Sequence, residues 1–141
     1  MTGHLRAAVA GAALIVVSGC GLSGDSTLGT LVTFESLESF DPPIQAAELS
    51  TDQEPEDVFS ELQDEDIDPL PPLGDETRRF AFIGSGCAHD SAQLVIEDDV
   101  LTAQLLEDGS TEQQTLCGGL AYFLSVFDVP AEDIPEQVRL S

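Results

Sequence analysis

The chain has 141 residues, with 27 Asp and Glu against four Arg and no Lys, and its formal net charge at pH 7 is −23. With so few cationic side chains it cannot neutralise phosphates, which excludes binding to nucleic acid and polybasic attachment to an anionic membrane. The length allows one small domain, and the 42% of hydrophobic residues exceeds what a disordered acidic chain contains.

The first residues have the layout of a secretory signal peptide. Arg6 supplies a positive charge, residues 7–17 are apolar, and Ser18 and Gly19 are small. The apolar run is shorter than the roughly 20 residues that a membrane-spanning helix needs. We therefore assign residues 1–19 to a signal peptide that is removed.

The end of this segment is more specific than its start. Val17-Ser18-Gly19-Cys20 resembles the lipobox of prokaryotic lipoproteins. The resemblance implies that a diacylglyceryl group is attached to the Cys20 thiol and that the chain is cut just before Cys20. The alternatives are an ordinary signal peptide with a chance cysteine and an uncleaved anchor. The expected location is the cell membrane, with the lipid-anchored domain facing outside the cytoplasm.

The acidic residues are spread over the whole chain that follows. Residues 35–75 carry fourteen of them and residues 78–141 carry eleven, so the charge is not gathered in one patch. Together with the absence of Lys, this resembles the protein composition of extreme halophiles, in which molar salt screens charges over about 3 Å. A codon bias against Lys in a high-GC bacterium and a cation-binding role are the alternatives.

The first half of the mature chain predicts a tether and two short elements. Residues 20–29 are rich in Gly and Ser, which is typical of a flexible linker. Residues 30–37 carry the β-branched and aromatic residues of a strand. Residues 44–49 fit either a short strand or a helical turn.

A helix is expected next, at about residues 54–63. Three apolar side chains, Val58, Phe59 and Leu62, fall on one helical face. Residues 64–76 then form an acidic connector whose three prolines exclude both a helix and a central strand. Apolar residues within the connector indicate that it lies over the domain.

The second half of the chain predicts strands. Residues 78–83 form one, and residues 92–97 and 100–106 form a hairpin around a two-residue turn. Residues 118–128 are apolar on both faces, which indicates a central strand covered from two sides. Residues 138–140 form a short closing strand.

These elements predict a single, mainly β domain over residues 30–141, built as a small β-sandwich-like or α+β fold with one short helix. Once Cys20 carries lipid, Cys87 and Cys117 are left in an oxidising compartment, and both lie beside glycines. We therefore predict a Cys87–Cys117 disulfide. A metal or redox site formed by Cys87, His89 and Cys117 is the alternative.

Two groups of residues are weak candidates for chemistry. His89 and Asp90 form a pair that would act as a general base if Ser85 or Ser91 were the nucleophile, but the sequence has no nucleophile-elbow motif. The more ordinary interpretation is a loop histidine beside a disulfide.

The second group lies in the connector. Asp64, Asp66 and Asp68 have the spacing that begins a calcium loop, but Pro69 stands where that loop needs Gly. We expect no cofactor and no dedicated metal site.

The function predicted from these observations is a membrane-anchored extracytoplasmic lipoprotein with a non-enzymatic binding, assembly or envelope role. The expected partners are the membrane, through the lipid on Cys20, and an envelope protein of unknown identity. The alternative is a small hydrolase or metal-binding protein that uses His89 and nearby carboxylates. The oligomeric state is left open.

Overall fold

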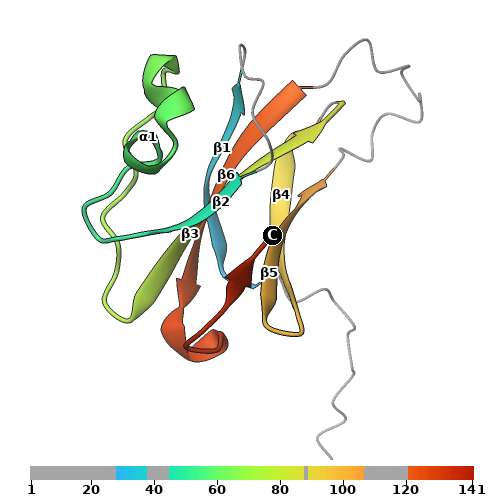
Figure 1. Ribbon diagram of the computed structural model, residues 1–141. Coiled ribbons are helices and arrows are strands. Elements are labelled where there is room, and N and C mark those ends of the chain that lie inside the picture. The colour runs from blue at the N-terminus through green and yellow to red at the C-terminus, as the bar shows by residue number, and fades with distance from the viewer. Residues whose placement is uncertain (1–27, 38–44, 88, 107–120) are drawn as a thin grey trace, which may run out of the picture.

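The computed structural model describes residues 28–37, 45–87, 89–106 and 121–141. As predicted, this part of the chain is mainly β, with two sheets and one short α-helix (Figure 1). The strands are β1 (Thr30–Leu37), β2 (Gln45–Leu49), β3 (Thr77–Gly86), β4 (Ser91–Glu97), β5 (Val100–Leu106), β6 (Ala121–Pro130) and β7 (Arg139–Leu140). The helical turns are α1 (Pro55–Val58), η1 (Ser60–Asp64) and η2 (Ala131–Asp133). The signal peptide, Cys20 and Cys117 lie outside the described residues.

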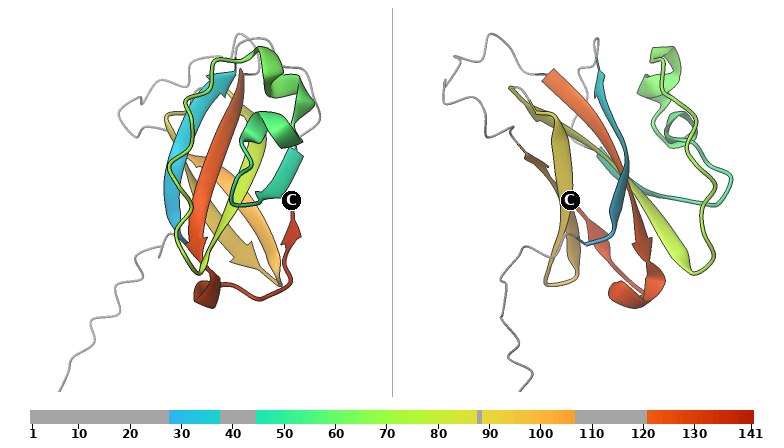
Figure 2. Two further views of the ribbon diagram at one scale, coloured as in Figure 1. Left: turned by 90° about the vertical axis from the view of Figure 1, so that its left-hand side faces the viewer. Right: turned by 180° about the vertical axis from the view of Figure 1, so that it is seen from behind.

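The strands form two sheets that face each other. The larger has the order β1-β6-β3-β2 and is antiparallel throughout, and the smaller has the order β4-β5-β7. In the smaller sheet β4 and β5 form an antiparallel hairpin, whereas β7 pairs with β5 in parallel. Figure 2 shows α1, η1 and the following connector on the side of the larger sheet that faces away from the smaller one. The domain is therefore layered, with the four-stranded sheet in the middle.

The long strand predicted at 118–128 holds the centre of the larger sheet. β6 lies between β1 and β3, and its register with β3 runs from Thr77 opposite Pro130 to Gly86 opposite Ala121. Every residue from Phe123 to Phe127 is buried. Because successive side chains of a strand point to opposite sides, an unbroken buried run requires cover on both faces of the sheet. The prediction that this strand is buried from both sides is confirmed.

One face of the larger sheet packs on the smaller sheet, and we call it the sandwich face. Its core contains fully or largely buried side chains from both sheets and from the segment after η2: Phe80, Phe82, Ala92, Leu94, Leu101, Phe127, Val129 and Ile134. The rings of Phe82 and Phe127 meet edge to face with centroids 6.1 Å apart. Burying this much apolar surface between two sheets is the main term that holds the domain together.

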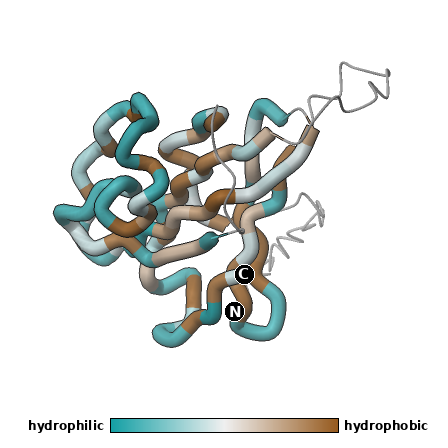
Figure 3. The backbone as a smooth tube through the Cα atoms, turned by 45° about the horizontal axis from the view of Figure 1, so that its top comes forward, coloured by the Kyte–Doolittle hydropathy of each residue, from teal (hydrophilic) through white to brown (hydrophobic). Residues whose placement is uncertain are grey.

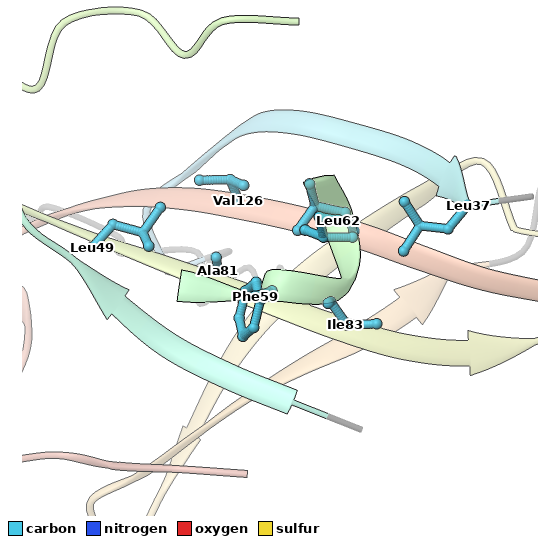
Figure 4. Packing of buried hydrophobic residues seen from close by; sticks show 8 residues of the cluster. Leu37, Leu49, Phe59, Leu62, Ala81, Ile83 and Val126 are labelled. Carbon is cyan, nitrogen blue, oxygen red and sulfur yellow. The ribbon is translucent and has the colours of Figure 1, made fainter. Parts of the chain in front are cut away.

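The opposite face, which we call the connector face, is covered by α1, η1 and the connector. Its core consists of Leu37, Leu49, Phe59, Leu62, Ala81, Ile83, Leu124 and Val126. Figure 4 shows Phe59 and Leu62 pointing onto the strands beside Ala81. Ile67 and Leu70 of the connector pack against the same core, which confirms that the connector lies over the domain. Figure 3 shows that this layer is otherwise largely hydrophilic, in contrast to the strands.

The single helix predicted at 54–63 is wrong in detail. The α-helical part ends at Val58, Phe59 is extended (φ −104°, ψ 93°), and a separate 3-10 turn follows from Ser60. Phe59 and Leu62 are buried, but Val58 is 37% exposed and does not share their face. The break at Phe59 turns both buried side chains toward the sheet, since burial of two large apolar groups outweighs continuous helical hydrogen bonding in so short a segment.

The predicted hairpin is confirmed. Its turn residues Asp98 and Asp99 both have positive φ angles, 48° and 64°, which is the geometry of a two-residue turn that matches the twist of the flanking strands. Asp tolerates this left-handed conformation better than most residues. β2 resolves the alternative at 44–49 in favour of a strand, and β7 confirms the closing strand at Arg139–Leu140.

The packed domain begins at Leu28, inside the segment that the sequence assigned to the tether. Leu28 contacts the sandwich core, and Gly29 has a φ of 74°. A Cβ atom at Gly29 would lie 2.6 Å from the carbonyl oxygen of Asp128, so only glycine fits this close approach to β6. The chain is therefore attached to the domain two residues before β1 starts.

Candidate functional site

His89, the main candidate for catalysis, lies just after β3 and packs against the sandwich side of the larger sheet. Its ring meets the ring of Phe123 edge to face at a centroid distance of 5.5 Å. A Cβ atom at Gly86 would collide with Nε2 of His89, so this edge of the imidazole rests directly on the backbone of β3. Nδ1 is buried and has no hydrogen-bond partner. Nδ1 is thus enclosed by protein, and Nε2 lies against the backbone of β3.

The neighbours that the sequence offered to His89 do not complete a catalytic arrangement. Asp90 is exposed, and within the described part of the chain no hydrogen bond joins His89 to Asp90, Ser85 or Ser91. A general base needs the proton that it removes within hydrogen-bond reach and a partner that orients its ring. The geometry gives the hydrolase alternative no support among these residues.

The acidic candidates for metal binding are also not brought together. Asp64 ends η1, and Asp66 and Asp68 follow in the extended connector, where both are exposed. In the described ranges no group of three or more His, Cys, Asp or Glu side chains is arranged to hold a metal ion. A hard cation such as calcium needs six or more oxygen ligands, so these carboxylates are solvated surface groups in this structure.

Of the three cysteines, only Cys87 belongs to the described residues. It is exposed, directly after β3. Because Cys117 and Cys20 lie outside those residues, the Cys87–Cys117 disulfide and the lipidation of Cys20 both stay predictions. Within the described segments, no helix is long and apolar enough to cross a bilayer.

Three shallow hollows on the described surface are lined by residues other than His89. One of about 330 Å³ lies on the outer face of the β4–β5 hairpin, lined by Val95, Thr102 and Gln104 among others. One of about 400 Å³ lies where β3 begins beside Pro130, and one of about 370 Å³ lies between the connector and Arg79. These hollows do not combine an apolar enclosure with convergent catalytic groups, as a small-molecule site does.

The two arginines at the start of β3 form ion pairs with carboxylates of neighbouring strands. Arg79 is only 3% exposed and donates from Nε and Nη2 to the two carboxylate oxygens of Asp128, at 2.6 and 2.7 Å. This hydrogen bonding to Asp128 raises the pKa of Arg79 despite the opposing effect of burial. The pair joins β3 to β6 beneath the connector, where Glu54 adds a further favourable charge.

Arg78 points to the opposite face, because successive residues of a strand alternate. It donates to both carboxylate oxygens of Glu48 on β2, at 2.8 and 2.9 Å, and to the carbonyl of Pro135, at 2.9 Å. Its guanidinium lies 5.1 Å from the ring centroid of Phe80. The hydrogen bond with Glu48 raises the pKa of Arg78. Arg78 therefore fastens the edge strand and the C-terminal segment to the central sheet.

These pairings were missed in the sequence. The available signal was the doublet Arg78-Arg79 at the start of a strand, which must send one guanidinium to each face of the sheet in a chain with almost no other cations. What the doublet does not reveal is the partners, since Asp128 lies 49 residues away and is selected by strand register.

Comparison of the chain with models of known protein families, with curated proteins and with solved structures finds no match.

Proposed function

We propose that this protein is an extracytoplasmic lipoprotein, held on the cell membrane by lipid on Cys20, whose domain has a non-enzymatic binding or assembly role. The observation that carries the proposal is the tetrapeptide Val17-Ser18-Gly19-Cys20 directly after the apolar run 7–17. Two acyl chains attached at one residue bind a membrane stably, because each buried methylene contributes about 0.8 kcal/mol.

The spacing between Cys20 and the domain supports this arrangement. Seven residues, 21–27, separate Cys20 from Leu28, where the packed domain begins. A segment of this length spans at most about 25 Å when it is fully extended. A lipid on Cys20 would thus hold the domain close to the membrane surface, while its acidic coat keeps it in water.

The non-enzymatic part of the proposal rests on the surroundings of His89. The imidazole packs between Phe123 and the backbone of Gly86, and its Nδ1 is buried without a partner. Such a ring fills space at the end of the core. A protein of this kind acts through its surface, by binding another component of the envelope.

The test is to change Cys20→Ser in the full-length protein expressed in a bacterial host. We expect the wild type to fractionate with membranes and its N-terminal peptide to carry a diacylglyceryl mass, whereas the variant is found in the aqueous fraction. Ser23→Ala, three residues later, is the matched control and should behave as the wild type. Unchanged membrane attachment of the Cys20 variant, or a wild-type N-terminal peptide without lipid, would contradict the proposal.

A further inference from the structure

Among the described strands, four edges end the two sheets, and three of them are protected against pairing with another chain. β1 has a register shift between Leu31 and Thr33 and carries Glu35. β2 has five residues and carries Glu48, and β7 has two residues. Bulges, charges and shortness are the usual means by which sheet edges avoid further strands.

β4 is neither short nor bulged, and its one charged residue, Glu97, is its last, beside the turn. It is seven residues long, it lies at the edge of its sheet, and its residues 91–96 are uncharged in a chain of net charge −23. Its pairing with β5 is regular from Ser91 opposite Leu106 to Glu97 opposite Val100. An unprotected edge in so acidic a chain is the place where another strand can approach without meeting negative charge.

The turn geometry shows which backbone groups face outward. In a hairpin with a two-residue turn, the residues that flank the turn exchange hydrogen bonds, and every second residue beyond them does the same. Glu97, Val95 and Gln93 therefore bond to β5. The backbone N–H and C=O groups of Ala92, Leu94 and Ile96 point away from it, toward the open edge.

The charges at the two ends of β4 define the partner. Asp90 precedes the strand, Glu97 ends it, and Asp98 and Asp99 follow it, so the uncharged run 91–96 is bounded by acids on both sides. A second copy is a poor occupant, since full antiparallel pairing about Leu94 would place Asp90 opposite Asp98 of the other copy. Like charges directly opposite each other destabilise a strand pair.

We propose that the β4 edge binds an extended segment of another protein as an additional strand, and that this segment has an uncharged, β-branched centre with Lys or Arg at both ends. Main-chain hydrogen bonds at Ala92, Leu94 and Ile96 would supply affinity, and the terminal cations would pair with the acids that flank β4. This inference rests on the proposed binding role and names the kind of partner that fits it.

The probe is a seven-residue peptide with Arg at each end and alternating Thr and Val between, added to the full-length protein in detergent. At about ten times its dissociation constant, we expect amide exchange at Ala92, Leu94 and Ile96 to slow by about tenfold, because binding protects the bound state by mass action. The amides of Gln93 and Val95, which already bond to β5, should change little. A peptide with Glu at each end is the control and should protect none of them.

Charge reversal tests the flanking acids. Asp90→Lys should weaken binding of the Arg-ended peptide by about tenfold, because it places like charges together at the edge. Asp52→Lys is the matched control: it makes the same charge change at an exposed position in the connector layer, on the far side of the larger sheet, and should weaken binding less than about twofold.

Three results would overturn the inference. The first is no alternate-residue protection at saturating peptide, and the second is equal weakening by both variants. The third is protection that rises with protein concentration in the absence of peptide, together with a dimer in sedimentation, which would identify a second copy as the occupant. Because none of these readouts depends on the lipid, failure here is distinguishable from failure of the Cys20 test.

Discussion

The two faces of the four-stranded sheet are covered in different ways, although the same strands supply both. On the sandwich face the central strands and β1 present phenylalanines, and the cover is a regular sheet. On the connector face they present Ala81, aliphatic side chains and the half-buried Tyr122, and the cover is irregular chain that contributes Phe59. A second sheet packs about 10 Å away, so large rings fill that gap, whereas a small Ala81 lets a helical turn come close.

The two covers also differ in how they are held. The strands of the smaller sheet are held to one another by backbone hydrogen bonds. At the β7 edge, the backbone N–H groups of Arg139 and Ser141 donate to the carbonyls of Asp99 and Leu101. The connector is held by side chains, including Glu54, whose Oε2 accepts a hydrogen bond from the backbone N–H of Leu70 at 3.1 Å. We therefore expect the sandwich face to unfold only with the whole domain, while the connector face can open locally.

The strongest way to test the sandwich face is Phe80→Ala. Phe80 is fully buried, and we expect its truncation to lower the free energy of unfolding by about 3–5 kcal/mol through lost burial and a residual cavity. The measurement is the midpoint of denaturant unfolding. Val58→Ala, at an exposed position, is the control and should cost less than about 0.5 kcal/mol. A small effect at Phe80 would show that the sandwich core is not the main source of stability.

Substitutions of the adjacent arginines compare the contributions of the two faces to stability, because Arg78 and Arg79 lie on opposite sides of the sheet. Arg79→Met leaves Asp128 without its bidentate partner under the connector, and we expect a loss of about 3 kcal/mol. Arg78→Met breaks a pair in which Glu48 is 45% exposed, so it should cost about 1 kcal/mol. Adding Asp128→Leu to Arg79→Met should recover much of the loss. If the two single variants lowered the free energy of unfolding equally, the claim that Arg79 forms the more buried and more stabilising ion pair would be contradicted.

Local patterns in the sequence predict most of the strands, and the reason is physical. The unbroken apolar run at 118–128 and the two-residue turn at Asp98-Asp99 depend only on neighbouring residues. The break at Phe59 was missed because it results from packing on Ala81, which lies 22 residues further along the chain. The parallel pairing of β7 and the contact of His89 with Phe123 are likewise set by register between distant segments.

The unprotected edge of β4 was missed for the same reason. Its uncharged run 91–96 is visible in the sequence, but whether a strand lies at an edge or in the centre depends on the order of the whole sheet. The burial of Nδ1 of His89 could not be predicted either, because the sequence shows only a histidine beside an acid and not how the chain packs around it.

A subtler substitution tests whether the connector opens by itself. Glu54→Gln replaces a charged acceptor with a neutral one, and a hydrogen bond to a charged group is worth about 1 kcal/mol more than its neutral counterpart. We expect the Leu70 amide to exchange about fivefold faster, while the amide of Val126 in the central strand keeps its rate, because only the connector opens. Glu132→Gln, an exposed substitution in η2, is the control and should change neither rate. If the Leu70 and Val126 amides accelerated together, the connector would be part of the same cooperative unit as the sandwich, and the two faces would differ in construction but not in stability.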